Sequence, residues 1–187
     1  MTAAVGAQAA DRDAGRRKAE PCGACHGPDG NATTPGTPSL AGQPAFFTHW
    51  QLIKYRDGRR TDPQMSPLAQ NLTDEDMADL AAFYEAQPPR PRARAAPPDP
   101  ARVAAGRRIA EVHHCTSCHR PGLTGQQQAA RLAGQDRDYL LRLLRAFKAR
   151  TASDLDGTMT IATQPLREED IESLVDFITS LGGEGSR

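Results

Sequence analysis

The stretch Cys22-Gly-Ala-Cys25-His26 returns in the second half of the sequence as Cys115-Thr-Ser-Cys118-His119. The pattern C-x-x-C-H is the attachment signature of c-type haem. Cysteines at this spacing lie on one helical turn, so both thiols can form thioethers with the vinyl groups of one porphyrin, and the histidine that follows can ligate the iron. The two copies therefore predict two covalently bound haems, with the histidine of each copy as an iron ligand.

Zinc sites, disulfides and thioredoxin-like redox sites also use paired cysteines, and each fits this sequence less well. In a common zinc pattern the second C-x-x-C pair follows within roughly 15–20 residues, whereas here the second pair lies far down the chain. Disulfides do not need a histidine after each pair. A thioredoxin-like motif is expected to follow a strand, and helical sequence precedes both copies.

The sequence around the two motifs is also duplicated. Leu40-Ala-Gly-Gln43 recurs as Leu132-Ala-Gly-Gln135, and Leu80-Ala-Ala-Phe-Tyr84 aligns with Leu174-Val-Asp-Phe-Ile178. Between the copies, residues 87–100 contain six prolines, which exclude a helix and favour extended, semi-rigid geometry. We therefore predict two similar domains in tandem. The expected divisions are 1–10 for a signal remnant or disordered tail, 11–88 for the first domain, 89–100 for a Pro/Arg-rich linker and 101–187 for the second domain.

Both halves read as all-α, with no convincing strand alternation. Pro44 is expected at the first position of one helix, and Thr73 with Asp76 has the pattern of a capping box at the start of another. Aromatic residues make up only 5% of the chain, so each domain of about 90 residues has a weak core and needs a cofactor to hold it together. Further helices are expected at 11–20, 101–112, 136–150 and 168–181.

The sixth iron ligands are predicted among the four methionines. Met65 and Met159 follow the two motifs at nearly equal distances, in Pro- or Gly-bearing segments that we expect to be irregular. A thioether ligand raises the haem potential and, being soft, favours Fe(II). Met77 falls on the apolar stripe of a helix and is expected to pack in the core. His114 remains an alternative ligand for the second iron.

Composition argues against several other classes of protein. Lys+Arg and Asp+Glu both total 23, so no excess of positive charge favours a nucleic-acid partner. No apolar run approaches the roughly 18 residues of a membrane-spanning helix, and we expect no integral membrane span. Residues 1–10 are small and apolar, and Ala7-Gln8-Ala9 has the form of a signal-peptide cleavage site.

Together these residues resemble the dihaem cytochromes of the c4 type. The resemblance runs from about residue 11 to 181 and includes Pro38-Ser-Leu-Ala-Gly-Gln43, Leu72-Thr-Asp-Glu-Asp76, and the segments around Met65 and Met159. It implies two class I cytochrome c folds packed about a pseudo-twofold axis, with haems close enough for electron transfer between them. It also implies a periplasmic protein that delivers electrons to a terminal oxidase or reductase. Because two irons that are each ligated on both sides can only accept and pass electrons, we expect no catalysed reaction.

The resemblance also assigns a role to Pro38, whose carbonyl is expected to accept the imidazole N–H of His26, orient the ring and tune the iron. The matching position in the second half is Ala130, whose carbonyl could accept the same bond in a less rigid loop. The predicted haem-binding residues are Cys22, Cys25, His26, Pro38, Met65, Cys115, Cys118, His119 and Met159, with the iron held by His26, Met65, His119 and Met159.

Two further functions stay open at this point. The chain could be a fixed electron-transfer subunit of a periplasmic dehydrogenase or oxidase complex, with a permanent interface in place of transient contacts at the haem edges. Because segment 156–160 looks looser than its counterpart, Met159 could also fail to bind iron, which would give a haem enzyme or gas sensor with an open second haem. The basic residues of 137–150 form either a solvated face or a contact surface for an acidic redox partner.

Overall fold

The computed structural model describes residues 9–90, 92–93, 97–154 and 156–181. All regular structure in those ranges is helical, apart from an isolated bridge between Gln126 and Ala129. The all-α prediction is therefore confirmed. The expected tail at 1–10 falls mostly on residues 1–8, which lie outside the described residues.

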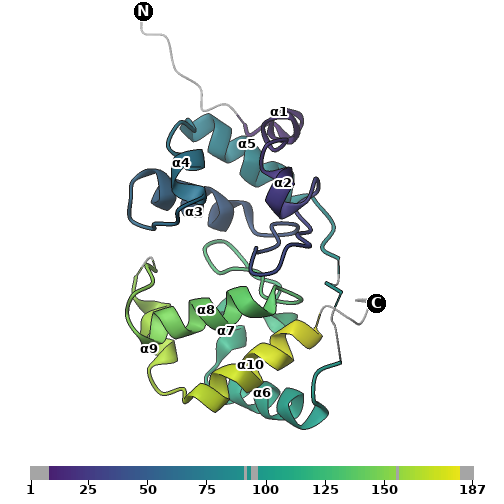
Figure 1. Cartoon of the computed structure of the whole chain (residues 1–187), viewed down its shortest axis with the longest axis vertical. Helices are drawn as coiled ribbons and strands as arrows, with labels where there is room; N and C mark the ends of the chain where they lie inside the picture. Colours follow the sequence, from purple (N-terminus) through teal and green to yellow (C-terminus); the bar gives the residue numbers. More distant parts are fainter. Residues whose placement is uncertain (1–8, 91, 94–96, 155, 182–187) are drawn as a thin grey trace, which may run out of the picture.

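The helices of the first half are α1 Arg12–Lys18, α2 Gly23–His26, α3 Ala45–Arg56, α4 Met65–Ala69 and α5 Asp74–Glu85 (Figure 1). The side chain of Asp11 caps α1 by accepting the N–H groups of Asp13 and Ala14. Thr73 forms the predicted capping box at the start of α5. Pro44 is the N-cap of α3 rather than its first helical residue, a difference that leaves the predicted helix in place.

The second half repeats this order with α6 Pro100–Val112, α7 Cys115–His119, the short 3-10 helix η1 Pro121–Leu123, α8 Arg137–Lys148, α9 Thr158–Thr163 and α10 Glu168–Ser180. The side chain of Asp99 caps α6 by accepting the N–H of Ala101. Helix α8 ends earlier than the predicted segment 136–150, because Arg150 adopts a φ of 59° that the helix cannot accommodate.

Each half contains the same crossing of its first and last helices: α1 packs on α5, and α6 packs on α10. A glycine lies at each crossing. A Cβ atom on Gly15 would lie 2.1 Å from the carbonyl oxygen of Asp79, and one on Gly106 would lie 2.0 Å from that of Ser173. Only glycine lets two backbones approach so closely, so the duplication extends to the packing of the helices.

The two cores differ in size. In the first half, Leu80, Phe83 and Tyr84 of α5 form a small buried cluster with Ala19. Met77 is 0% exposed, which confirms its interpretation as a core residue. The second half has a larger cluster, built mainly from α8 and α10. Its buried members are Ala110, Leu123, Leu140, Leu141, Leu144, Leu166, Ile171, Leu174, Val175, Phe177 and Ile178.

The two halves face each other across the loops that follow the cysteine motifs (Figure 1). Arg92 of the linker donates to the carbonyls of Thr37 and Thr34 in the first half, at 3.0 and 2.9 Å. The same guanidinium pairs with Asp136 of the second half at 3.1 Å. Described residues of the linker therefore tie the two halves together by direct contact as well as by chain connection.

Candidate functional site

Each cysteine motif forms one short helical turn. In the first motif, the N–H groups of Cys25 and His26 donate to the carbonyl of Cys22 at 3.2 and 3.0 Å. The second motif forms α7 itself. In both motifs the first cysteine is half-buried and the second is exposed, and none of the four is in a disulfide. The thiols of each pair are thus spaced as attachment to one porphyrin requires.

The two motif histidines are buried and hydrogen-bonded in the same way. His26 Nδ1 lies 2.8 Å from the carbonyl oxygen of Pro38, and His119 Nδ1 lies 2.7 Å from that of Ala130. Because a carbonyl oxygen can only accept, Nδ1 carries the proton in both rings and Nε2 keeps its lone pair. Burial lowers the pKa of both imidazoles, and the carbonyl contacts oppose that effect only in part. Both side chains are therefore neutral imidazoles suited to bind a metal through Nε2.

The expectation that Met65 and Met159 lie in irregular segments is wrong. Met65 is the first residue of α4, and Met159 lies in the first turn of α9. An aspartate begins each turn: Asp62 Oδ1 accepts the N–H of Met65 at 2.9 Å, and Asp156 Oδ1 accepts the N–H of Thr158 at 3.0 Å. These local side-chain bonds replace the missing amide partners of a helix start. Both methionines are half-buried, and an aspartate accepts the N–H of Met65 itself in the first half and that of Thr158, the residue before Met159, in the second.

Three buried polar atoms of the described residues have no hydrogen-bond partner there: Thr48 Oγ1, His49 Nε2 and Trp50 Nε1. Such atoms are costly to bury unpaired, so each needs an explanation such as a bound group. All three belong to α3 of the first half. A haem combines a large apolar ring with polar carboxylate edges, so these residues and the cysteine motif fit that group.

Two cytochrome family patterns match the chain, one in each half. Residues 9–83 match subunit III of cbb3-type cytochrome c oxidase, and residues 103–182 match cytochrome c. Cytochrome c4 of Pseudomonas aeruginosa is 36% identical over 184 residues, which cover 92% of this chain and 90% of that protein. The chain belongs to the cytochrome c4 family.

A solved structure and a second kind of relative agree with this membership. The crystal structure of reduced cytochrome c4 from Pseudomonas stutzeri superposes with a TM-score of 0.83 at 29% identity, covering 91% of this chain and 98% of that one. A thiosulfate dehydrogenase electron acceptor from Stutzerimonas stutzeri is 30% identical over 171 residues, or 86% of this chain and 79% of that protein.

The family assignment gives the chain its cofactors and its role. It consists of two class I cytochrome c domains in tandem, and each domain carries one covalently attached c-type haem. It is an electron-transfer protein. None of its described helices is long and apolar enough to cross a membrane.

Two glutamines form a contact between the domains that the sequence did not reveal. Gln43 Nε2 donates to the carbonyl of Arg131 at 2.8 Å, and Gln135 Nε2 donates to the carbonyl of Ser39 at 2.9 Å. The repeated Leu-Ala-Gly-Gln sequence marked both residues as special. It did not show that each one reaches across to the other domain.

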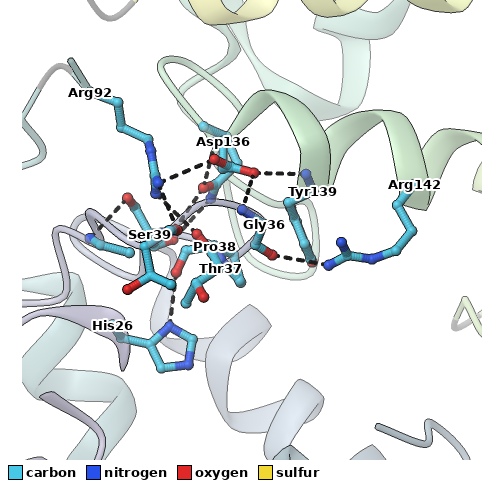
Figure 2. Close-up of polar contacts among 12 residues, drawn as sticks. His26, Gly36, Thr37, Pro38, Ser39, Arg92, Asp136, Tyr139 and Arg142 are labelled. Carbon is cyan, nitrogen blue, oxygen red and sulfur yellow. Dashed lines mark hydrogen bonds and ion pairs between the residues drawn. The ribbon is translucent and has the colours of Figure 1, made fainter. Parts of the chain in front are cut away.

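Most of the basic side chains of helix α8 bind partners within the molecule. Arg137 pairs with Asp176 at 3.2 Å, Arg145 pairs with Glu168, and Lys148 donates to the carbonyl of Gln164 at 3.0 Å. Arg142 crosses to the first domain and donates to the carbonyl of Gly36 at 3.0 Å (Figure 2). These contacts favour the interpretation of this helix as a structural, solvated face over an acidic-partner surface.

Proposed function

We propose that this chain is a periplasmic carrier of single electrons that catalyses no reaction of its own. The observation that carries the proposal is the similarity of the two sites: each half supplies paired thiols, a buried imidazole whose Nδ1 is bonded to a main-chain carbonyl, and a methionine at the start of a short helix. The proposed domains are 11–88 and 101–187, joined by the linker 89–100.

In this proposal each iron is closed to small molecules. Cys22 and Cys25 would hold the first haem, and His26 and Met65 would ligate its iron. In the second domain Cys115 and Cys118 would attach the haem, and His119 and Met159 would ligate its iron. A histidine–methionine ligand pair raises the reduction potential of a haem. With both ligands supplied by the chain, these residues would leave no coordination position for a substrate or for dioxygen.

The location follows from the chemistry of attachment. Thioether formation between cysteine and haem is completed on the oxidising side of the bacterial membrane, so a chain with two such motifs works in the periplasm.

The proposed exchange is between a dehydrogenase that supplies electrons and a terminal oxidase or reductase that removes them. The likeness to a thiosulfate dehydrogenase electron acceptor supports a dehydrogenase as donor. The same likeness favours a second arrangement, in which the chain stays bound to that enzyme as a fixed subunit. Gel filtration of the chain with a candidate dehydrogenase separates the two: co-elution at micromolar concentration in physiological salt indicates a subunit, and separate elution indicates a mobile carrier.

Titration of the dithionite-reduced, haem-loaded protein with carbon monoxide tests the ligand assignment. We expect two haems per chain and no bound CO, because both axial positions are filled. The Met65→Ala and Met159→Ala variants should each bind one CO per chain. Met77→Leu, a change in the core, is the matched control and should bind none. One CO bound by the unmodified chain would contradict one of the two methionine assignments and favour an open haem with enzymatic or sensing chemistry.

A further inference from the structure

The two interface glutamines make a reciprocal exchange with the opposite domain. Ser39 N–H donates to Gln135 Oε1 at 2.7 Å, and Gln135 Nε2 donates back to the Ser39 carbonyl at 2.9 Å. Arg131 N–H donates to Gln43 Oε1 at 3.0 Å, and Gln43 Nε2 returns a bond to the Arg131 carbonyl at 2.8 Å. Gln43 and Gln135 are only 4% and 6% exposed, so solvent competes little for these bonds.

The peptide groups that these glutamines contact are the same ones that hold the motif histidines. In the first domain, the Pro38 carbonyl accepts the Nδ1 proton of His26, and the N–H of that same peptide, at Ser39, donates to Gln135 (Figure 2 shows His26, Pro38 and Ser39). In the second domain the Ala130 carbonyl accepts from His119, and the N–H of the same peptide, at Arg131, donates to Gln43.

We propose that Gln43 and Gln135 are positioning residues that tune the haem of the opposite domain. This inference rests on the proposed assignment of His26 and His119 as iron ligands. Hydrogen bonds in series polarise one another. When a peptide N–H gives its proton to a glutamine, its carbonyl oxygen becomes more electron-rich and accepts the imidazole N–H more strongly. The imidazole then donates more charge to the iron, which favours Fe(III) and lowers the reduction potential.

The first domain offers the cleaner place to observe this effect, because its histidine loop has other attachments. Gly36 N–H donates to Asp136 Oδ1 at 3.0 Å, and Arg92 binds the carbonyls of Thr34 and Thr37 (Figure 2). Gln135 Oε1 also accepts the main-chain N–H of Asp136 at 2.9 Å, whereas the Arg92 bonds to Thr34 and Thr37 do not involve the Gln135 side chain. The Arg92 bonds should hold the loop in place when that side chain is changed, so that the variant reports on polarisation of the peptide rather than on its displacement.

The test is a redox titration of the haem-loaded full chain in which the haem methyl signals of each domain are followed separately by NMR. Gln135→Leu removes the acceptor and should raise the potential of the first-domain haem. Gln135→Glu keeps an acceptor oxygen and adds negative charge, so it should lower that potential. Hydrogen bonds in series strengthen one another by roughly 10–30% of the energy of each bond. We therefore expect the equilibrium constant for haem reduction to change by about twofold to tenfold. Gln43→Leu should instead raise the potential of the second-domain haem.

Opposite shifts from Leu and Glu, larger in the domain opposite to the mutation, support the proposal. Equal shifts in both haems, a larger shift in the glutamine's own domain, or the same sign for both substitutions overturn it. Gln87→Leu is the control, since the Gln87 side chain donates within its own domain, to the carbonyl of Phe83, and its loss should move neither potential. CO is added to each reduced sample. If the unmodified chain binds no CO and the mutations do not shift the potential of the opposite domain's haem, this inference alone is overturned. If the unmodified chain binds CO, the ligand assignment on which the inference depends is overturned.

Discussion

His26 and His119 have the same main-chain support, although the residues beside them differ. A carbonyl acceptor does not depend on residue type, so Ala130 serves as well as Pro38. The loops around them differ in strain. Gly27 follows the first histidine with a φ of 79°, and Arg120 holds the matching position with a φ of 65° and a ψ of 161°. That combination is a region of backbone space that residues with a Cβ rarely adopt.

Arg120→Gly should therefore stabilise the second domain. Removing the Cβ from a backbone conformation of this kind should raise the free energy of unfolding by roughly 1–3 kcal/mol. The added freedom of glycine in the unfolded chain should lower it again by about 0.5–1 kcal/mol. We expect a net gain of about 1 kcal/mol in thermal unfolding of the haem-loaded protein. Arg120→Ala keeps the Cβ and should show no gain. An equal gain from both substitutions would mean that the arginine side chain, rather than the backbone, is the source of the cost.

At the scale of helices, the crossing of the first and last helix in each half depends on a single missing side chain. Gly106→Ala would place a Cβ 2.0 Å from the carbonyl oxygen of Ser173, so α6 and α10 would have to separate. We expect a loss of about 3 kcal/mol in chemical unfolding, at the upper end for overpacked cores. Gly23→Ala is the control: its Cβ meets nothing nearer than 3.4 Å, and the second motif has Thr116 at that position. A loss below about 0.5 kcal/mol for Gly106→Ala, within ordinary surface effects, would contradict the close crossing.

The helices also show which features a sequence can reveal. The capping box of Thr73 was predictable because its partners lie within one turn. The short helices α4 and α9 were not predicted, because five or six residues are too few to display a helical period. Gly15 and Gly106 were missed for another reason. The need for glycine there comes from a partner helix distant in sequence, and no local pattern records it.

For the molecule as a whole, the duplication predicted two domains and two haems, and it left the contact between the domains undetermined. The side chains that build this contact are those of glutamine, arginine, aspartate and lysine, residue types that are also common on open surfaces. Only the assembled structure shows that Gln43, Gln135 and Asp136 are buried there. The pairing of the domains is polar and directional, so it fixes one relative orientation and holds the two histidine loops against each other.

Lys54 gives this interface a dependence on pH. It is 3% exposed, and its Nζ donates to the carbonyl of Ser153 in the other domain at 2.5 Å. Burial lowers its pKa from 10.5 to about 8, with the charges of Arg60 and Arg59 adding to the effect and that of Asp154 opposing it. Between pH 8 and 10.5 the unfolded chain binds a proton that the folded chain has released, so the stability contribution of this residue rises with pH across that window.

Below about pH 8 the folded protein keeps Lys54 charged and bears the full cost of burying it. The Lys54→Met variant lacks that titration. Its stability advantage over the unmodified chain should therefore be largest below pH 8 and should shrink steadily toward pH 10.5. Chemical unfolding of the reduced, haem-loaded protein across this range measures the difference. Lys54→Arg keeps a charge throughout, so it should lack the rise of the unmodified chain and gain no relief at high pH. The free energy of unfolding of the Lys54→Met variant could instead change with pH in parallel with that of the unmodified chain. Lys54 would then carry the same charge in the folded and unfolded states, and any pH dependence of the interface would come from other groups.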